Sequence, residues 1–114
     1  MDKNQATISY YAGMLPNQVR VKVHREGDGS FWAKLVDFPG AGTQGKNFSD
    51  LMEMISDAIY IVHDIPEEYY PFMPRYIPPE IKEELDRRKI QNQFNEFIAR
   101  QIDSTRELQF SKNG

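Results

Sequence analysis

The clearest pattern along the chain is a strict alternation of apolar and polar residues between positions 19 and 24. Valine occupies every second position, with polar residues between: Val19, Val21 and Val23 alternate with Arg20, Lys22 and His24. A period of two predicts a strand with one face on a core and the other in water. Asp28 and Gly29, within a Gly-Asp-Gly turn, then allow the chain to reverse. We therefore predict an antiparallel hairpin from Val19 to Val36.

The second strand of this hairpin has an unusual outer face. Alternation places Phe31, Ala33 and Leu35 inward, and Trp32, Lys34 and Val36 outward. A large aromatic beside a valine is uncommon on a solvated face. Either the N-terminal or C-terminal segment of the chain folds over Trp32 and Val36, or these side chains belong to a partner-binding patch.

A helix is predicted from Phe48 to Asp64, because apolar residues change there from a period of two to helical spacing. One helical face is formed by Phe48, Leu51, Met52, Ile55, Ala58, Ile59 and Val62. Asn47 is the expected N-cap, and Asp50 favours the positive end of the helix dipole. A second apolar stripe contains Met54, Ala58, Ile61 and Ile65. One sheet covers only one stripe, so we expect the C-terminal segment or a second chain to meet the other.

The segment from Asp37 to Lys46 joins the hairpin to this helix and contains three glycines. It has neither the G-x-G-x-x-G spacing of a dinucleotide-binding loop nor the G-K-[ST] of a P-loop. We interpret it as a structural crossover loop. Gly40 and Gly45 are expected to act through backbone conformation, at positive φ.

The stretch from Pro66 to Pro79 holds five of the seven prolines, together with Tyr69, Tyr70, Phe72 and Tyr76. Proline disfavours helix and central strand, so an extended connector with a short edge strand around Tyr69 to Tyr76 is predicted. A charged helical segment from Glu80 to about Asp103 follows, with a change in apolar phase near Arg88. A short strand is possible at Leu108 and Phe110.

These elements predict an α+β fold: an antiparallel sheet of three to four strands with one helix packed across it, plus a C-terminal helical extension. The expected organisation is an N-terminal arm (1–18), a sheet-helix domain with a proline-rich exit (19–79), and a C-terminal helical extension and tail (80–114).

Composition narrows the function classes. The chain has 114 residues, a formal net charge of −3 and no cysteine. Cysteine nucleophiles, thiolate metal sites and disulfides are therefore excluded. There is no apolar run of membrane-spanning length, and the N-terminus is too polar for a secretion signal, so we expect a soluble cytoplasmic protein.

Candidate catalytic chemistry is sparse. His24 and His63 have no metal-ligand spacing, and no nucleophile motif accompanies them. We expect no catalytic residues, no metal site and no cofactor, and hence no enzyme. The only local basic run is Arg87 to Lys89. The C-terminal segment shows no ribbon-helix-helix or helix-turn-helix pattern, which leaves nucleic-acid binding uncertain.

The stretch from Val19 to Glu67 resembles the N-terminal domain of HicB-type antitoxins. The matching residues occur in register: Asp28, Gly29, Phe31, Ala33, Asp37, Pro39, Gly40, Thr43, Gln44, Gly45, Ala58 and Ile59. The resemblance implies a protein that binds a HicA-like, mRNA-cleaving toxin and inhibits it sterically. Many members carry a C-terminal DNA-binding domain, from which this chain departs.

The expected partner-binding residues are Trp32, Asp37, Phe38, Pro39, Tyr69, Tyr70 and Phe72. The alternative is an orphan binding protein of the same fold, acting as a dimeric adaptor or as an inhibitor of another target such as a defence nuclease. A neighbouring reading frame encoding a short basic protein with a histidine would favour the first.

The sequence also predicts self-association, because the Phe48 to Asp64 helix has two apolar stripes and the C-terminal helix changes phase. Light scattering at micromolar concentration should report a dimer or larger species. A strictly monomeric mass, with Ile61, Phe94 and Phe97 all buried within one chain, would contradict this prediction.

Overall fold

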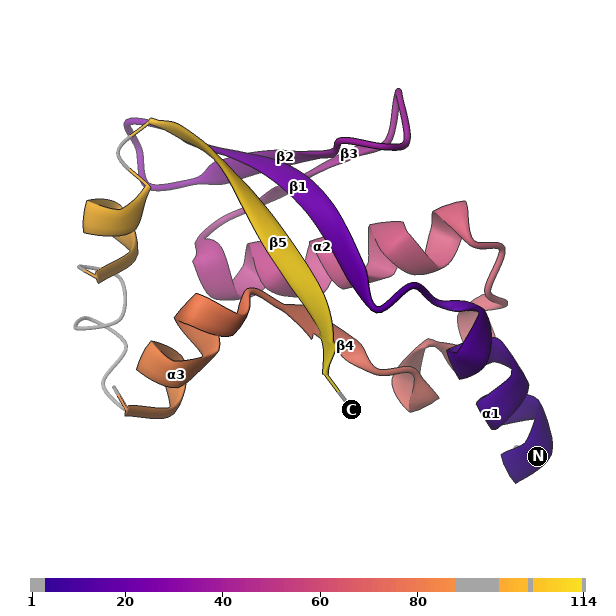
Figure 1. Ribbon diagram of the computed structural model, residues 1–114. Helices are drawn as coiled ribbons and strands as arrows, with labels where there is room; N and C mark the ends of the chain where they lie inside the picture. Colours follow the sequence, from indigo (N-terminus) through magenta and orange to yellow (C-terminus); the bar gives the residue numbers. More distant parts are fainter. Residues whose placement is uncertain (1–3, 88–96, 103, 114) are drawn as a thin grey trace.

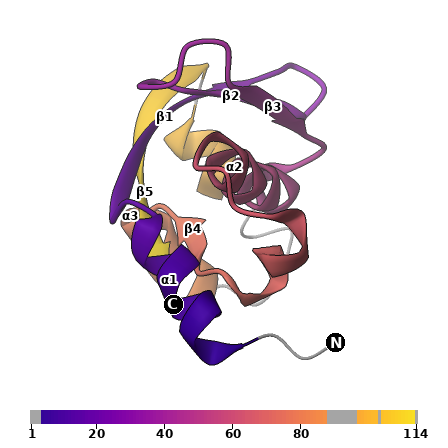
Figure 2. The same cartoon turned by 90° about the vertical axis from the view of Figure 1, so that its right-hand side faces the viewer.

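A computed structural model describes residues 4–87, 97–102 and 104–113. Five antiparallel strands in the order β3-β2-β1-β5-β4 curl around a central helix, α2 (Figures 1 and 2). The elements follow in the order α1 (Gln5–Met14), β1 (Gln18–Arg25), β2 (Phe31–Leu35), β3 (Gly42–Gly45), α2 (Phe48–Val62), 3-10 helix η1 (Glu67–Phe72), β4 (Arg75–Ile77), α3 (Pro79–Arg87) and β5 (Thr105–Asn113). Residues 97–101 are also helical. The predicted class, α+β with an antiparallel sheet and a helix across it, is confirmed, with five strands in place of three to four.

The predicted hairpin is present as β1 and β2. Val23 pairs with Ala33, and His24 with Trp32. The three valines of β1 are buried, as are Phe31, Ala33 and Leu35 of β2. The apolar sets of both strands therefore share the concave face towards α2, and Trp32 and Lys34 lie on the opposite, convex face.

The prediction of a crossover loop between Asp37 and Lys46 is only partly correct. Its second half forms β3, which pairs with β2 at the edge of the sheet. Gly40 has a φ of +88°, as expected, but no positive φ is found at Gly45. A β-carbon at Gly45 would lie 2.6 Å from the backbone nitrogen of Leu51. Gly45 is thus required by the close approach of β3 to α2 and not by its own φ.

Helix α2 follows the predicted face closely. The Asn47 side chain accepts from the backbone N–H of Asp50 at 2.8 Å and caps the helix. Phe48, Leu51, Met52, Ile55 and Ile59 are buried, and Phe48 meets Phe31 edge to face at 5.6 Å. Fully burying such a side chain contributes about 1.5 to 3 kcal/mol, so this face supplies much of the core.

The second stripe of α2 divides between core and solvent. Ile65 is buried and Ala58 half-buried, whereas Met54 and Ile61 are 39% and 62% exposed. Phe97 packs partly buried against the core, and Phe94 lies outside the described residues. The exposed positions leave self-association as a prediction.

The connector from Pro66 to Pro79 was predicted to be extended, but it is not extended throughout. Residues Glu67 to Phe72 form η1, which accommodates Pro71. The predicted edge strand is confirmed as β4, centred on Tyr76. Tyr76 joins three parts of the chain: its N–H donates to Ser56 of α2 at 3.0 Å, and its hydroxyl donates to the Pro16 carbonyl. Burial raises the pKa of Tyr76, which keeps that hydroxyl protonated as a donor.

Residues Thr105–Asn113 form a strand inside the sheet, between β1 and β4. The strand predicted at Leu108 and Phe110 extends over nine residues as β5. It pairs with β1 over seven positions and with β4 on its other side. Strand β5 therefore joins β1 to β4 within one sheet. The predicted helix from Glu80 to about Asp103 is described only in part, as α3 and residues 97–101.

The N-terminal arm contains a helix that its sequence does not indicate. Asn4 caps α1 by accepting from Ala6 N–H at 2.7 Å. The helix packs against η1, where Tyr11 meets Tyr69, and Lys112 of β5 donates to the Ala12 carbonyl at 3.0 Å. Figures 1 and 2 both place α1 at the end of the molecule away from β2 and β3. Helix α1 therefore lies apart from β2, the strand that contains Trp32.

Candidate functional site

The turn between β1 and β2 is held by Asp28. Its carboxylate accepts from Ser30, from the backbone N–H at 3.0 Å and from the hydroxyl at 2.6 Å. These hydrogen bonds lower the pKa of Asp28. Gly29 has a φ of +89°, a conformation that side chains disfavour. Both residues therefore have the structural role expected of them.

The corner between β2 and β3 is a tight, hydrogen-bonded reversal. Phe38 N–H donates to the Leu35 carbonyl at 3.2 Å, and Ala41 N–H donates to the Phe38 carbonyl at 3.0 Å. Asp37 forms an ion pair with Arg20 of β1 at 2.6 Å, which raises the pKa of Arg20. Both partners are about half exposed, so this ion pair orients the corner more than it stabilises the fold.

Replacing Gly40 by valine is expected to lower the free energy of unfolding by about 1 to 3 kcal/mol, because a β-branched residue is strained at its φ of +88°. No atom lies within 4 Å of the added β-carbon, so backbone strain is the sole local cause. Urea unfolding followed by circular dichroism measures the change. A transition unchanged from that of the parent chain would contradict this assignment.

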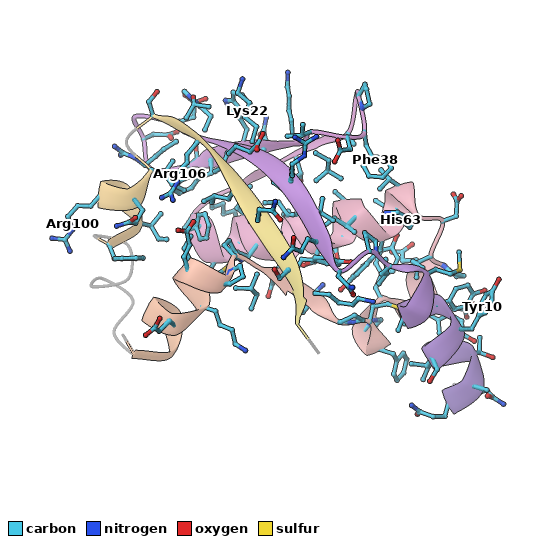
Figure 3. The ribbon with its side chains drawn as sticks, viewed as in Figure 1. Tyr10, Lys22, Phe38, His63, Arg100 and Arg106 are labelled. Carbon is cyan, nitrogen blue, oxygen red and sulfur yellow. The ribbon has the colours of Figure 1, made fainter. Side chains whose placement is uncertain are left out.

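Phe38 and Pro39 leave this corner in different directions. Phe38 is half-buried and meets His63 edge to face at 5.3 Å, at the end of α2 (Figure 3). Pro39 is exposed. Beside them lies a hollow of about 470 Å³, whose lining includes Lys34 and Val36 of the β2 side and Lys22 of β1. The corner thus presents an apolar hollow with a cationic rim.

Trp32 lies on the convex face next to this hollow. Its ring stacks on His24 at 5.0 Å with 25° between the planes, and the Lys34 ammonium lies 5.7 Å from its centroid. The His24 ring is fixed by a 2.6 Å hydrogen bond to the Thr105 hydroxyl. Lys34 borders both the hollow and Trp32, so these groups form one surface. We call Trp32, Lys34, Val36, Phe38 and Pro39 the Trp32 corner.

The remaining predicted contact residues are not brought to the Trp32 corner. Tyr69 packs on Tyr11 of α1 at 5.0 Å, and Tyr70 packs on Tyr60 of α2 at 5.0 Å. Both tyrosines thus join elements within the chain. Phe72 is 47% exposed and borders a separate hollow between α1 and the β4 side. Of the predicted contact residues, Trp32, Phe38 and Pro39 therefore belong to the Trp32 corner. Tyr69, Tyr70 and Phe72 belong to η1.

Lys22 and Lys34 line the hollow of the Trp32 corner, although neither is among the partner-binding residues predicted from the sequence. Lys22 pairs directly with Lys34 across the hairpin, so their side chains share the convex face. The same alternation that placed Trp32 outward, combined with the hairpin register, is the signal that finds Lys22. Its contribution is positive charge, since the hollow is lined by the side chains of both lysines.

Neither histidine belongs to a group that could hold a metal ion within the described residues. Within the described part of the chain, no three His, Cys, Asp or Glu side chains are placed to hold one metal ion. His24 lies in the stack with Trp32, and His63 lies against Phe38. The Nε2 atom of His63 is buried without a hydrogen-bond partner. Both rings pack against an aromatic side chain, and His24 also bonds to the Thr105 hydroxyl and lies 3.7 Å from the Glu26 carboxylate.

No helix in the described ranges is both long and apolar enough to cross a membrane.

The fold and the corner define a small α+β protein with a curled antiparallel sheet and an aromatic, cation-rimmed surface on its convex face. Comparison with protein-family models, curated proteins and solved structures gives no match for this chain.

Proposed function

We propose that this protein is a HicB-like antitoxin, which binds a HicA-like, mRNA-cleaving toxin in the cytoplasm and inhibits it by covering its catalytic face. The observation that carries the proposal is the succession of β1, turn, β2, corner, β3 and α2, the order that the resemblance implies. The protein acts by binding and has no catalytic turnover of its own.

The matched residues have identifiable roles in that succession. Asp28 and Gly29 form the turn, and Phe31 and Ala33 enter the core. Gly40 and Gly45 provide the corner and the close approach of α2. These roles explain why such residues accompany this fold, and they support the resemblance at the level of structure.

The Trp32 corner is the contact surface that we propose. It combines a large aromatic side chain and an adjacent apolar hollow, features typical of protein-binding hot spots, with two lysines at its rim. A partner side chain that fills the hollow would contact Val36 and Phe38 and lie beside Trp32.

A second candidate is an orphan binding protein of the same fold, acting as a dimeric adaptor or as an inhibitor of another target. The course of the C-terminal segment favours it. Where many family members have a DNA-binding domain, the described residues of this chain form α3, helical residues 97–101 and β5, a central strand.

The decisive experiment co-expresses the protein with the product of a neighbouring reading frame that encodes a short basic protein. Copurification, calorimetry and an mRNA-cleavage assay with equimolar protein test binding and inhibition together. Stoichiometric inhibition supports the antitoxin, and binding without nuclease activity supports the second candidate. A parallel gel shift uses the protein's own promoter, and nanomolar, salt-sensitive binding there without a protein partner would overturn both.

A further inference from the structure

Lys22 and Lys34 place two like charges side by side on the convex face. They are directly opposite one another in the pairing of β1 with β2, and both line the hollow of the Trp32 corner. Like charges in this arrangement repel one another and destabilise a sheet. On the other side of β1, Glu107 of β5 lies opposite Lys22, so the row carries two positive charges and one negative charge. The pairing of the strands by itself gives no reason for two adjacent lysines.

Both lysines are available to an anion from outside the chain. Within the described residues, neither ammonium group takes part in an ion pair or a hydrogen bond, and both side chains are exposed. Lys34 lies 5.7 Å from the centroid of the Trp32 ring. Asp37, the carboxylate of this corner, is already paired with Arg20 at 2.6 Å. The positive charge of the two lysines is therefore not neutralised at the corner itself.

A second hollow provides an internal comparison. The hollow between α1 and the β4 side is also lined by two cations, Arg75 and Lys112. Arg75 donates to the Asp57 carboxylate at 3.3 Å, and Lys112 donates to the Ala12 carbonyl at 3.0 Å. Both cations are thus occupied by groups of the chain, in contrast to the two lysines of the Trp32 corner.

The lining of the corner hollow combines positive charge with apolar surface. Apart from its two lysines, the hollow of about 470 Å³ is lined only by apolar residues and glycine. Its volume lies within the range of about 300 to 1,000 Å³ that is typical of ligand sites. A hollow on the β3 side of Trp32 is instead lined by charges of both signs, from Glu26, Asp50 and Lys46. The corner hollow is therefore suited to a ligand that is both apolar and anionic.

The position of this hollow favours a chain segment as the ligand. The described helices leave the convex face uncovered in Figures 1 and 2, and Figure 3 shows Lys22 on this outer side of the sheet. Val36 and Pro39 at the hollow are exposed. A ligand can therefore approach from solvent and extend along the surface to Trp32, as a segment of a protein would.

We propose that the Trp32 corner binds a segment of the protein partner in which apolar side chains are flanked by glutamate or aspartate. The apolar side chains fill the hollow against Val36 and Phe38, and the carboxylates pair with Lys22 and Lys34. The inference rests on the proposed function, because it specifies the chemistry of the bound segment. The net charge of −3 attracts a partner that is basic overall, and the two lysines select the orientation in which its acidic segment meets the corner.

A blocked hexapeptide, Glu-Glu-Leu-Leu-Glu-Glu, serves as the probe. The fluorescence of Trp32, the only tryptophan, reports its binding, and NMR titration of the backbone amides locates it. We expect saturable binding that weakens with added salt and that shifts the amide signals of Val36, Ala41 and Gly42 at the hollow. Absence of saturable binding, or shifts confined to the hollow beside Phe72, would overturn the proposal.

Two matched peptides separate the charge from the apolar contact. Gln-Gln-Leu-Leu-Gln-Gln retains the leucines without the carboxylates, and Glu-Glu-Ser-Ser-Glu-Glu retains the carboxylates without the leucines. Each should bind at least about tenfold more weakly than the probe, because each loses one of the two contacts. Equal binding of the serine peptide would show that the hollow is not used, and equal binding of the glutamine peptide would show that the lysines are not used.

Lys22→Glu tests the lysines on the protein side. The introduced carboxylate lies opposite Lys34 and pairs with it, so one substitution removes the positive charge of both positions. Arg100→Glu is the control, because it changes the net charge equally at an exposed cation that Figure 3 shows apart from Lys22. We expect Lys22→Glu to bind the probe at least about tenfold more weakly than Arg100→Glu does. Circular dichroism checks that both variants are folded, and equal weakening would contradict a local site.

Failure of this inference is distinguishable from failure of the proposed function. If Lys22→Glu inhibits a copurified toxin as fully as Arg100→Glu does, the function stands and the lysines are not the contact. If the probe binds as expected but no toxin is inhibited, the site stands and the antitoxin function is wrong. If light scattering shows that Lys22→Glu alone converts a dimer to a monomer, a second copy occupies the corner and the proposed partner segment is wrong.

Discussion

Replacing Gly45 by alanine is expected to lower the free energy of unfolding by about 3 kcal/mol, more than the strained Gly40→Val variant. The added β-carbon would lie 2.6 Å from the backbone nitrogen and 2.7 Å from the Cα of Leu51. These atoms belong to the backbone of α2 and cannot rotate aside as a side chain can. The helix must shift away from β3, which disturbs the packing of buried Leu51 against the sheet.

Gly27→Ala is the matched control for this prediction. It adds the same methyl group, but nothing lies within 4 Å of it. We expect its effect to stay within about 0.5 kcal/mol. Urea unfolding monitored by circular dichroism measures both variants. Equal stability of the two would show that β3 and α2 are less closely packed in solution, and the steric role of Gly45 would then be wrong.

Trp32→Ala is expected to weaken binding of the protein partner by about 2 kcal/mol or more, roughly a 30-fold increase in Kd. The ring lies on the convex face, stacked on His24 and beside the Lys34 ammonium. Its removal would eliminate the aromatic centre of the Trp32 corner but no part of the buried core, so the fold should survive. Calorimetry with the copurified partner measures the affinity, and circular dichroism checks the fold.

Tyr10→Ala provides a control that also removes an exposed aromatic. Tyr10 is 65% exposed on α1, and Figure 3 shows it apart from Phe38 of the corner, with His63 between them. Its removal should leave affinity unchanged. Equal weakening by both substitutions would indicate a general loss of apolar surface, and unchanged affinity in Trp32→Ala would remove the corner from the interface.

Elements with strong local signals were predictable from the sequence. The signals for β1, for the Asp28–Gly29 turn and for α2 come from residues that are close together in the sequence. In β1 and α2 the pattern of apolar residues directly shows which side is buried. The outward position of Trp32 followed from the same alternation. Asp37 and Pro39 are exposed and Trp32 is half-buried, and their contact with a partner stays a prediction.

Helix α1 and η1 were missed because their local signals are weak or misleading. The apolar residues of α1 do not form one face, and the helix is held by its Asn4 cap and its contact with Tyr69. Pro71 favoured the prediction of an extended connector. It is nevertheless accommodated in η1, a short 3-10 helix, although proline has no backbone N–H to donate. In both cases, contacts with residues distant in the sequence outweighed the local secondary-structure propensity.

By itself, the sequence determined the hairpin, the central helix and its caps, because hydrophobic periodicity and turn residues act over a few positions. Only the tertiary structure decided that β5 lies between β1 and β4, that Gly45 is a point of close packing, and that Tyr69 and Tyr70 are apart from Trp32. These features depend on which distant segments satisfy one another's backbone hydrogen bonds and bury one another's side chains. Strand partnership of this kind leaves no local pattern, since any strand with an apolar face can pair with several others.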